Sequence, residues 1–128
     1  MVTAITEGVK ITVNTNFRSE YSNPDQNNYL FSYRILIENQ GDYAVKLLSR
    51  HWHIFDSCGE YREVEGEGVV GQQPTLKPGN VYEYESACNL RTDVGSMKGT
   101  YLMQRIIDQS QFLVNIPEFQ LISPFKLN

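Results

Sequence analysis

Apolar and polar residues alternate along most of this chain. Successive side chains of a β-strand point to opposite faces, so a period of two predicts strands with one buried face. The apolar members of the pattern are Val9, Ile11, Val13, Tyr29, Phe31, Tyr33, Ile35, Ile37, Val45, Leu47, Leu48, Trp52, Ile54, Tyr82, Tyr84, Tyr101, Met103, Phe112, Val114 and Ile116. No stripe at the i, i+3, i+4 spacing continues for the length of a helix. We therefore expect an all-β protein.

Turn-forming residues separate the predicted strands. Glycine reaches positive φ without steric cost and proline fixes φ at about −65°, so clusters of these residues with Asn, Asp and Ser favour turns. Such clusters lie at 23–25, 40–42, 57–59, 77–79 and 95–99. Short strands joined in this way predict an antiparallel β-sandwich. Pro117 lacks an amide donor inside the last predicted strand, which predicts a sheet edge or a bulge there.

Length and charge restrict the class of protein. The chain has 128 residues and a net charge of −4. The length suits one domain spanning residues 1–128, and the charge is opposite to the basic surface that nucleic-acid-binding proteins present. The stretch MVTAITEGVKITV has no uninterrupted apolar run behind basic residues, and no later segment has about 18 apolar residues, so we expect neither a signal peptide nor a membrane span. We expect a cytoplasmic protein with no nucleic-acid or membrane partner.

The two cysteines, Cys58 and Cys88, are too few for a disulfide framework and too far apart for a CxxC motif. We expect free thiols, with a Cys58–Cys88 bridge as the alternative.

Exposed strand edges would permit a homodimer, although no residue requires one.

The segment EGEGVVG has the glycine spacing of a dinucleotide-binding loop, at Gly66, Gly68 and Gly71. That loop also needs a helix N-terminus after the glycines, where free amides hold the pyrophosphate. Here Pro74 and Pro78 follow, and proline disrupts a helix. We expect no helix after Gly71, and glycines that let a β-connection bend closely over the sheet.

Anion binding by the amides of this segment is the alternative, because a nest of successive backbone amides attracts anions without a helix. Arg50 and Arg62 would be the cations of that site. Arg50 also has the strand parity of Trp52, so its guanidinium either reaches over the sheet edge or pairs inside with an acid. We prefer structural pairing, with an acid such as Asp56, over a role of Arg50 in ligand binding.

His51 and His53 share one strand face, with their side chains about 7 Å apart. Trp52 and Ile54 take the opposite, buried face. This spacing suits a transition metal if a third ligand comes from a neighbouring strand. No HExxH motif, cysteine pair or further histidine supplies that ligand in the sequence. We expect no cofactor, and His51 and His53 are the candidates should a metal bind.

Acidic residues form two further stripes, at Glu63, Glu65 and Glu67 and at Glu83 and Glu85. If the two strands were neighbours, these carboxylates would repel one another unless a cation intervened. Because Mg²⁺ prefers few carboxylates and several waters, we interpret the stripes as solvated sheet faces, with weak magnesium binding as the alternative.

Catalytic signatures are missing from the sequence. There is no GxSxG motif and no recognised spacing of a nucleophile and a base. Ser86 and Cys88 would resemble nucleophiles only if folding brought them beside His51, and Cys88 is more simply a small buried residue. We expect no enzyme.

Four stretches carry a resemblance to a known family: SRHWHIFDSCGE, VEGEGVVGQQPTLKPGNVYEYESAC, GSMKGTYLM and IPEF. In this order they resemble the ApaG family, over about Val9 to Ser123. His51 matches the family pattern and His53 lies outside it. The resemblance implies an immunoglobulin- or fibronectin-III-like β-sandwich.

The resemblance also implies functions. Bacterial ApaG proteins are associated genetically with cobalt and magnesium resistance or efflux, without transport activity of their own. Similar domains occur in F-box proteins and in a DNA polymerase delta interacting protein, where they resemble protein-interaction modules. The family's glycine motif, a suggested pyrophosphate site, falls here on Gly66, Gly68 and Gly71.

We expect a non-enzymatic domain that binds another, unidentified protein. The predicted partner-binding loop displays Val69, Val70 and Leu76 in a segment held by glycine and proline, which loses little entropy on binding. Its residues are Gly66, Gly68, Val69, Val70, Gly71, Pro74, Leu76 and Pro78. Pyrophosphate or nucleotide binding through the glycine segment and direct Co²⁺ or Mg²⁺ binding are the alternatives.

Overall fold

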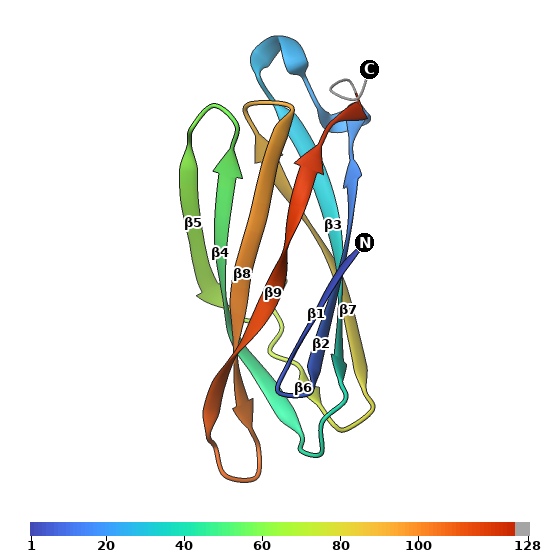
Figure 1. Cartoon of the computed structure of the whole chain (residues 1–128), viewed down its shortest axis with the longest axis vertical. Helices are drawn as coiled ribbons and strands as arrows, with labels where there is room; N and C mark the ends of the chain where they lie inside the picture. The colour runs from blue at the N-terminus through green and yellow to red at the C-terminus, as the bar shows by residue number, and fades with distance from the viewer. Residues whose placement is uncertain (125–128) are drawn as a thin grey trace.

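The computed structural model describes residues 1–124 and contains β-strands joined by turns (Figure 1). Within residues 1–123 its only helical segments are two 3-10 turns, Ser19–Tyr21 and Pro24–Gln26. The strands are β1 (Val2–Thr6), β2 (Val9–Phe17), β3 (Tyr29–Asn39), β4 (Val45–Asp56), β5 (Tyr61–Glu67), β6 (Thr75–Leu76), β7 (Val81–Leu90), β8 (Val94–Arg105) and β9 (Gln111–Ile122). The all-β expectation is confirmed, and β1 is a strand that the pattern did not predict.

Two antiparallel sheets pack face to face, as the sequence predicted. The first has the order β1-β2-β3-β7, and the second has the order β5-β4-β8-β9 with the short β6 beside β4. Along one side β1 packs against β9, where the Asn115 amide donates to the Thr6 hydroxyl at 3.2 Å. On the other side the edge strands β5 and β7 line cavities between the sheets. We call this side the open edge.

The core lies between the sheets and consists mainly of the alternating apolar residues. Trp52 packs edge-on against Tyr33 and Phe119, with ring centroids 5.4 and 5.8 Å apart. In the same core the hydroxyls of Tyr84 and Tyr101 hydrogen-bond to each other at 2.5 Å, so each buried hydroxyl has a partner. Burying one large apolar side chain stabilises a fold by about 1.5–3 kcal/mol, so this shared core accounts for the cohesion of the two sheets.

Two bulges shift the alternation from one strand face to the other. The pairing of β4 with β8 shifts between Leu47 and Ser49, so that Leu47 and Trp52 both face the core despite opposite parity. The pairing of β8 with β9 shifts between Met97 and Gly99, opposite Pro117. The prediction of an edge or bulge at Pro117 is confirmed, since β9 is an edge strand and is bulged there.

The cysteines are both free thiols, as expected, with Cys58 exposed and Cys88 buried. Burial raises the pKa of the Cys88 thiol, and the nearby Arg62 only partly opposes this effect. Within residues 1–124 no helix has the length and apolar character needed to cross a bilayer.

Candidate functional site

The glycine segment forms a tight β-turn between β5 and β6. No helix follows Gly71 in the described chain; the next element is β6, which pairs with β4. The prediction that proline prevents a helix here is therefore confirmed. Val69 and Gln72 exchange two backbone hydrogen bonds, of 2.8 and 2.9 Å. Both central residues, Val70 and Gly71, have positive φ, 47° and 77°, as in a type I′ turn.

Gly68 is required by a close backbone approach. Its φ is 61°, and a Cβ there would overlap the Gln72 carbonyl oxygen and lie 2.9 Å from the carbonyl carbon. Its amide donates to the Leu48 carbonyl at 2.9 Å, and the Val69 and Gln72 amides are used within the turn. Three amides of the supposed anion cradle therefore already have backbone partners.

Gly66 makes room for Arg50. The two residues are opposite each other in the pairing of β4 with β5, and a Cβ on Gly66 would lie 2.8–2.9 Å from the Arg50 guanidinium. The guanidinium donates from Nη1 to the Glu67 and Gly68 carbonyls, each at 3.0 Å. The glycine segment thus positions one arginine side chain.

The expected Arg50–Asp56 pair is wrong. Asp56 instead accepts hydrogen bonds from the Arg91 amide at 2.7 Å and from the Thr92 hydroxyl. Arg50 lies on the same strand face as Trp52, as predicted, but its side chain runs toward Gly68, away from Asp56.

The expected display of apolar residues by the partner-binding loop is also wrong in two of three cases. Val69 and Leu76 are buried, at 0% and 2% exposure, because the turn and β6 fold against the core. Val70 alone is displayed, at 62% exposure. Pro78 is exposed and Pro74 half-buried.

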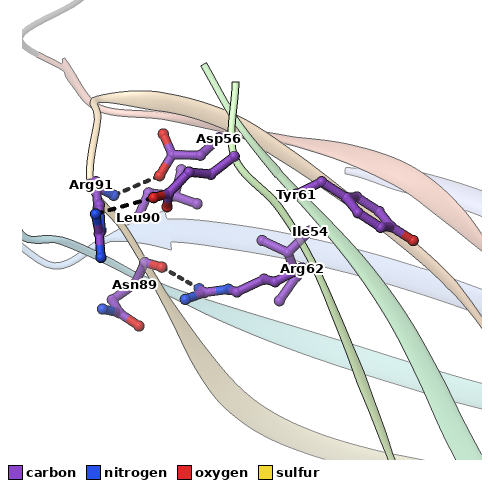
Figure 2. Close-up of a pocket in the computed structure, with 8 residues that line it drawn as sticks. Ile54, Asp56, Tyr61, Arg62, Asn89, Leu90 and Arg91 are labelled. Atoms are coloured by element: carbon purple, nitrogen blue, oxygen red, sulfur yellow. Dashed lines mark hydrogen bonds and ion pairs between the residues drawn. The ribbon is translucent and has the colours of Figure 1, made fainter. Parts of the chain in front are cut away.

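A cavity of about 380 Å³ lies at the open edge, where Figure 2 shows Arg62 reaching from β5 toward Asn89 on β7. There the Arg62 guanidinium donates to the Asn89 carbonyl and, at 3.3 Å, to the Cys88 sulfur. The carboxylates of this cavity are occupied: Glu60 pairs with Arg91 at 3.1 Å, and Asp56 holds the turn after β7.

A second cavity of about 320 Å³ continues along the open edge, and Arg62 lines both. Arg50 lines the second as well, together with Ser86 and Cys88 from β7 and the buried Tyr33 and Trp52. Among residues 1–124, no aspartate or glutamate lines it. We call this cavity the arginine cleft.

The two arginines of the cleft differ from the other arginines in the groups that they contact. Within residues 1–124, Arg50 and Arg62 are the arginines that make no ion pair, since Arg18, Arg34, Arg91 and Arg105 each contact a glutamate. Both donate to neutral acceptors only. The cleft therefore carries two positive charges without a compensating carboxylate.

The other titratable groups of the cleft are neutral near pH 7. Burial raises the pKa of the Tyr33 hydroxyl, although the Ser86 hydroxyl and the Arg50 charge oppose it. Burial likewise keeps Cys88 a thiol, so it is a poor nucleophile. His51 lies on the opposite face of β4 from Trp52, so the fold does not bring Ser86 and Cys88 together with His51 in a catalytic arrangement.

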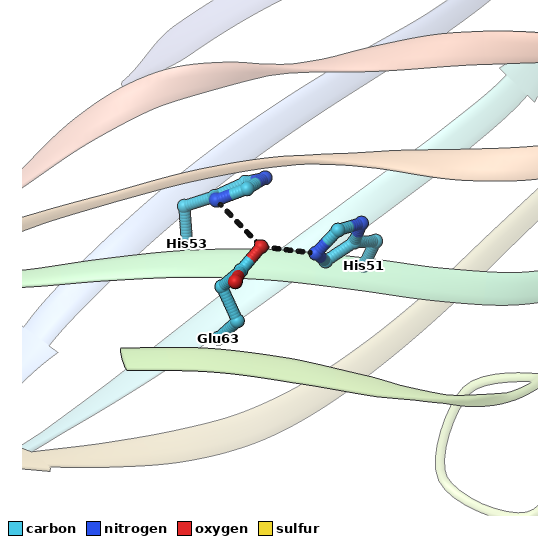
Figure 3. Close-up of side chains that lie close together, drawn as sticks. All are labelled: His51, His53 and Glu63. Carbon is cyan, nitrogen blue, oxygen red and sulfur yellow. Dashed lines mark hydrogen bonds and ion pairs between the residues drawn. The ribbon is translucent and has the colours of Figure 1, made fainter. Parts of the chain in front are cut away.

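The outer face of the second sheet carries the histidines, as the parity predicted. His51 and His53 lie with ring centroids 4.5 Å apart, and Glu63 from β5 lies between them (Figure 3). Hydrogen bonding to His51 lowers the pKa of Glu63. Sequence reasoning grouped Glu63 with the acidic stripe and did not place it beside the histidines.

The second acidic stripe lies in the other sheet, since Glu83 and Glu85 belong to β7. They pair with Arg34 of β3 and with Arg18, which directly follows β2: Arg34 contacts both glutamates, at 3.1 and 3.6 Å, and Arg18 contacts Glu85 at 3.6 Å. The strands that carry the two acidic stripes are thus not neighbours in a sheet. The repulsion between the stripes that would have called for a bridging cation such as Mg²⁺ therefore does not arise.

An apolar patch that sequence reasoning missed lies at the β8–β9 turn. Ile106 and Ile107 are 45% and 77% exposed, and the Ile106 amide donates to the Ala44 carbonyl at 3.0 Å. Tyr43, 49% exposed, lies under the Arg105 guanidinium at 5.1 Å. The signal was two adjacent isoleucines that break the alternation before Asp108.

Comparison with known proteins gives consistent matches. The ApaG domain model matches residues 19–105. A Protein ApaG from Anaeromyxobacter dehalogenans is 50% identical over the full length of both chains, and one from Sinorhizobium fredii is 45% identical over 97% of this chain and 95% of its own. A crystal structure of an ApaA protein from Bordetella pertussis superposes with a TM-score of 0.87 at 41% identity, covering 91% of this chain and 94% of that one.

Proposed function

This chain belongs to the ApaG family, and from that premise we propose that it is a non-catalytic binding protein whose arginine cleft holds an anion bearing phosphate groups. The single observation that carries this function is the pair of guanidiniums, Arg50 and Arg62, which line one cleft without any carboxylate. Because no carboxylate among the described residues of the cleft neutralises them, the two guanidiniums can pair with an anionic ligand.

Each guanidinium retains donors for that ligand. Arginine has five N–H groups in a planar fork that matches phosphate oxygens. Arg50 uses Nη1 and Arg62 uses Nη2 in their contacts with the protein, so the Nε and the other Nη of each are available. Charge-assisted hydrogen bonds of this kind stabilise a complex by about 1.5–3 kcal/mol each.

The strand geometry favours an elongated anion. Gly66, opposite Arg50, and Arg62 are four residues apart on β5, which is roughly 13 Å of strand. Two linked phosphate groups reach both guanidiniums more readily than one phosphate does. The cleft volume of about 320 Å³ also lies within the usual range of small-ligand sites.

In this proposal the glycine motif acts through Arg50. Gly66 leaves the space that the guanidinium occupies, and Gly68, directly before the turn, presents a carbonyl that accepts from it. The anion is bound by side chains, and the amides of Gly68, Val69 and Gln72 stay in the turn.

Isothermal titration with inorganic pyrophosphate tests the function. We expect saturable binding, stronger than that of inorganic phosphate, and Arg62→Gln is expected to weaken it by about 1.5–3 kcal/mol, roughly tenfold or more. Arg34→Gln is the matched control: it removes the same charge from an exposed, ion-paired arginine of the first sheet and leaves the affinity unchanged. Equal losses in the two variants would mean only nonspecific attraction to charge, and the proposal would fail.

A protein partner is the second candidate, and Val70 favours it. A β-branched residue with φ of 47° is strained, and this one is exposed at the tip of the turn. Strained residues that persist in an exposed position point to function. The expected surface is now Val70 with its exposed neighbours, without Val69 and Leu76.

Val70→Asn separates this candidate from a purely structural role. Asparagine tolerates left-handed backbone and suits a type I′ turn before glycine, so urea unfolding is expected to show a gain of about 1 kcal/mol. If Val70 contacts a partner, affinity capture with this more stable variant loses a protein that wild type retains. Val81→Asn, at a 53% exposed strand position, is the control and keeps that protein. Unchanged capture by Val70→Asn would exclude Val70 as a contact.

A further inference from the structure

We propose that His51, His53 and Glu63 form a binding site for a divalent transition metal on the outer face of the second sheet. The site lies on the opposite face of β4 from the arginine cleft and is independent of the function proposed there. It unites a histidine pair from one strand with a carboxylate from the next (Figure 3).

The register of the strands brings the three side chains together. His53 is directly opposite Glu63 in the pairing of β4 with β5, and His51 is two residues along on the same face. One Glu63 oxygen, Oε1, lies 2.9 Å from His51 Nε2 and 3.5 Å from His53 Nδ1. One ligand atom from each of the three residues lies within 4.8 Å of the others.

These distances are close to those of a coordinated metal. With metal–nitrogen and metal–oxygen bonds of about 2.0–2.1 Å, tetrahedral ligand atoms are roughly 3.3 Å apart. The two distances from Glu63 bracket that value, so small side-chain rotations suffice to admit an ion. Because the sheet holds both strands, the ligands are preorganised.

A fourth residue supplies the outer partner that histidine ligands commonly have. Glu65 Oε1 lies 3.3 Å from His51 Nδ1. A carboxylate that accepts from Nδ1–H fixes the tautomer in which Nε2 presents its lone pair to a metal, and it makes that nitrogen more basic. Glu65 is therefore a positioning residue in this site.

The surrounding groups are compatible with a bound cation. Glu63 and Glu65 together provide two negative charges. Lys98, opposite His53 on β8, has its ammonium 5.7 Å from the Phe55 ring centroid, stacked on that ring. The Tyr61 hydroxyl, which hydrogen-bonds to His53 Nδ1, would turn to a metal-bound water.

The ligand set selects the class of metal. Imidazole nitrogens suit Zn²⁺, Co²⁺ and Ni²⁺, whereas Mg²⁺ requires oxygen ligands and several waters. Three protein ligands on a half-exposed face leave at least one position to water. The site is therefore expected to take Zn²⁺ and Co²⁺ and to be insensitive to excess Mg²⁺.

Titration of the full chain with Co²⁺ tests the site, because the visible absorption of Co²⁺ reports its coordination. We expect one equivalent to bind with a visible band of low-coordinate Co²⁺, and we expect Zn²⁺, but not Mg²⁺, to displace it. His51→Gln and His53→Gln are each expected to weaken binding by at least the roughly 10–100-fold that loss of an outer partner costs. Circular dichroism of the metal-free variants checks that they are folded.

Two glutamate variants make the test specific. Glu65→Gln is expected to weaken Co²⁺ binding by about 10–100-fold while the absorption band persists, since the direct ligands remain. Glu67→Gln removes the same charge from the same strand and face, where no histidine contacts its side chain, and is expected to change nothing. Equal weakening in Glu65→Gln and Glu67→Gln, wild-type affinity in both histidine variants, or no Co²⁺ binding at millimolar concentration would overturn the proposal.

Discussion

Replacing Gly68 by alanine is expected to lower the free energy of unfolding by about 2–5 kcal/mol. Two costs add. An alanine with φ of 61° is strained by about 1–2 kcal/mol, and forcing a methyl group into an occupied space costs typically 1–3 kcal/mol. The occupied space is the Gln72 carbonyl, which is backbone and is held by the two hydrogen bonds of the turn. It cannot move aside as a flexible side chain would.

Gly71→Ala is the control for this loss. Gly71 also has positive φ, 77°, but no atom of the described residues, other than its own neighbours in the chain, lies within 4 Å of the position of its Cβ. Only the backbone strain of about 1–2 kcal/mol is expected there. Urea denaturation of both variants measures the difference. Equal losses would show that the close approach to Gln72 contributes nothing and that the motif reflects backbone conformation alone.

Gly66→Ala is expected to weaken pyrophosphate binding about tenfold or more, although it removes no charge. The new methyl group would lie 2.8–2.9 Å from the Arg50 guanidinium, which must then leave the cleft. Losing the charge-assisted hydrogen bonds of one arginine costs about 1.5–3 kcal/mol. The expected change in folding stability is smaller, because an arginine side chain can move into solvent.

Two comparisons separate this effect from general damage. Adding Arg50→Gln to Gly66→Ala is expected to cause no further loss of affinity, since both changes remove the same contact. Gly79→Ala, at another turn with no atom within 4 Å of its Cβ position, is expected to leave the affinity unchanged. Additive losses in the double variant would contradict the idea that Gly66 acts through Arg50.

Much of the fold was predictable because β-strands leave a local signal. The alternation located strands such as β3 and β4, and Pro117 indicated the bulge in β9. The local pattern did not show whether apolar residues in turns would be exposed or buried. Val69 and Leu76 were expected to be displayed, but the pairing of β6 with β4 carries Leu76 into the core and the turn buries Val69.

For the candidate sites, the sequence predicted which residues of one strand share a face, but not which residues of neighbouring strands come together. Parity placed His51 with His53 and separated them from Trp52, while Glu63 joined them through the β4–β5 register, which depends on tertiary pairing. The predicted partner of Arg50 was wrong for the same reason. Whether Arg50 meets Asp56 or the Gly68 carbonyl depends on where the chain turns after β5.

Side-chain NMR of the arginine Nε–Hε groups during a pyrophosphate titration tests the central claim most directly. The account predicts that the signals of Arg50 and Arg62 shift together and saturate, while those of the ion-paired Arg34 and Arg91 stay in place. Shifts confined to Arg34 and Arg91, or equal small shifts of all arginines that never saturate, would show that the cleft is not an anion site.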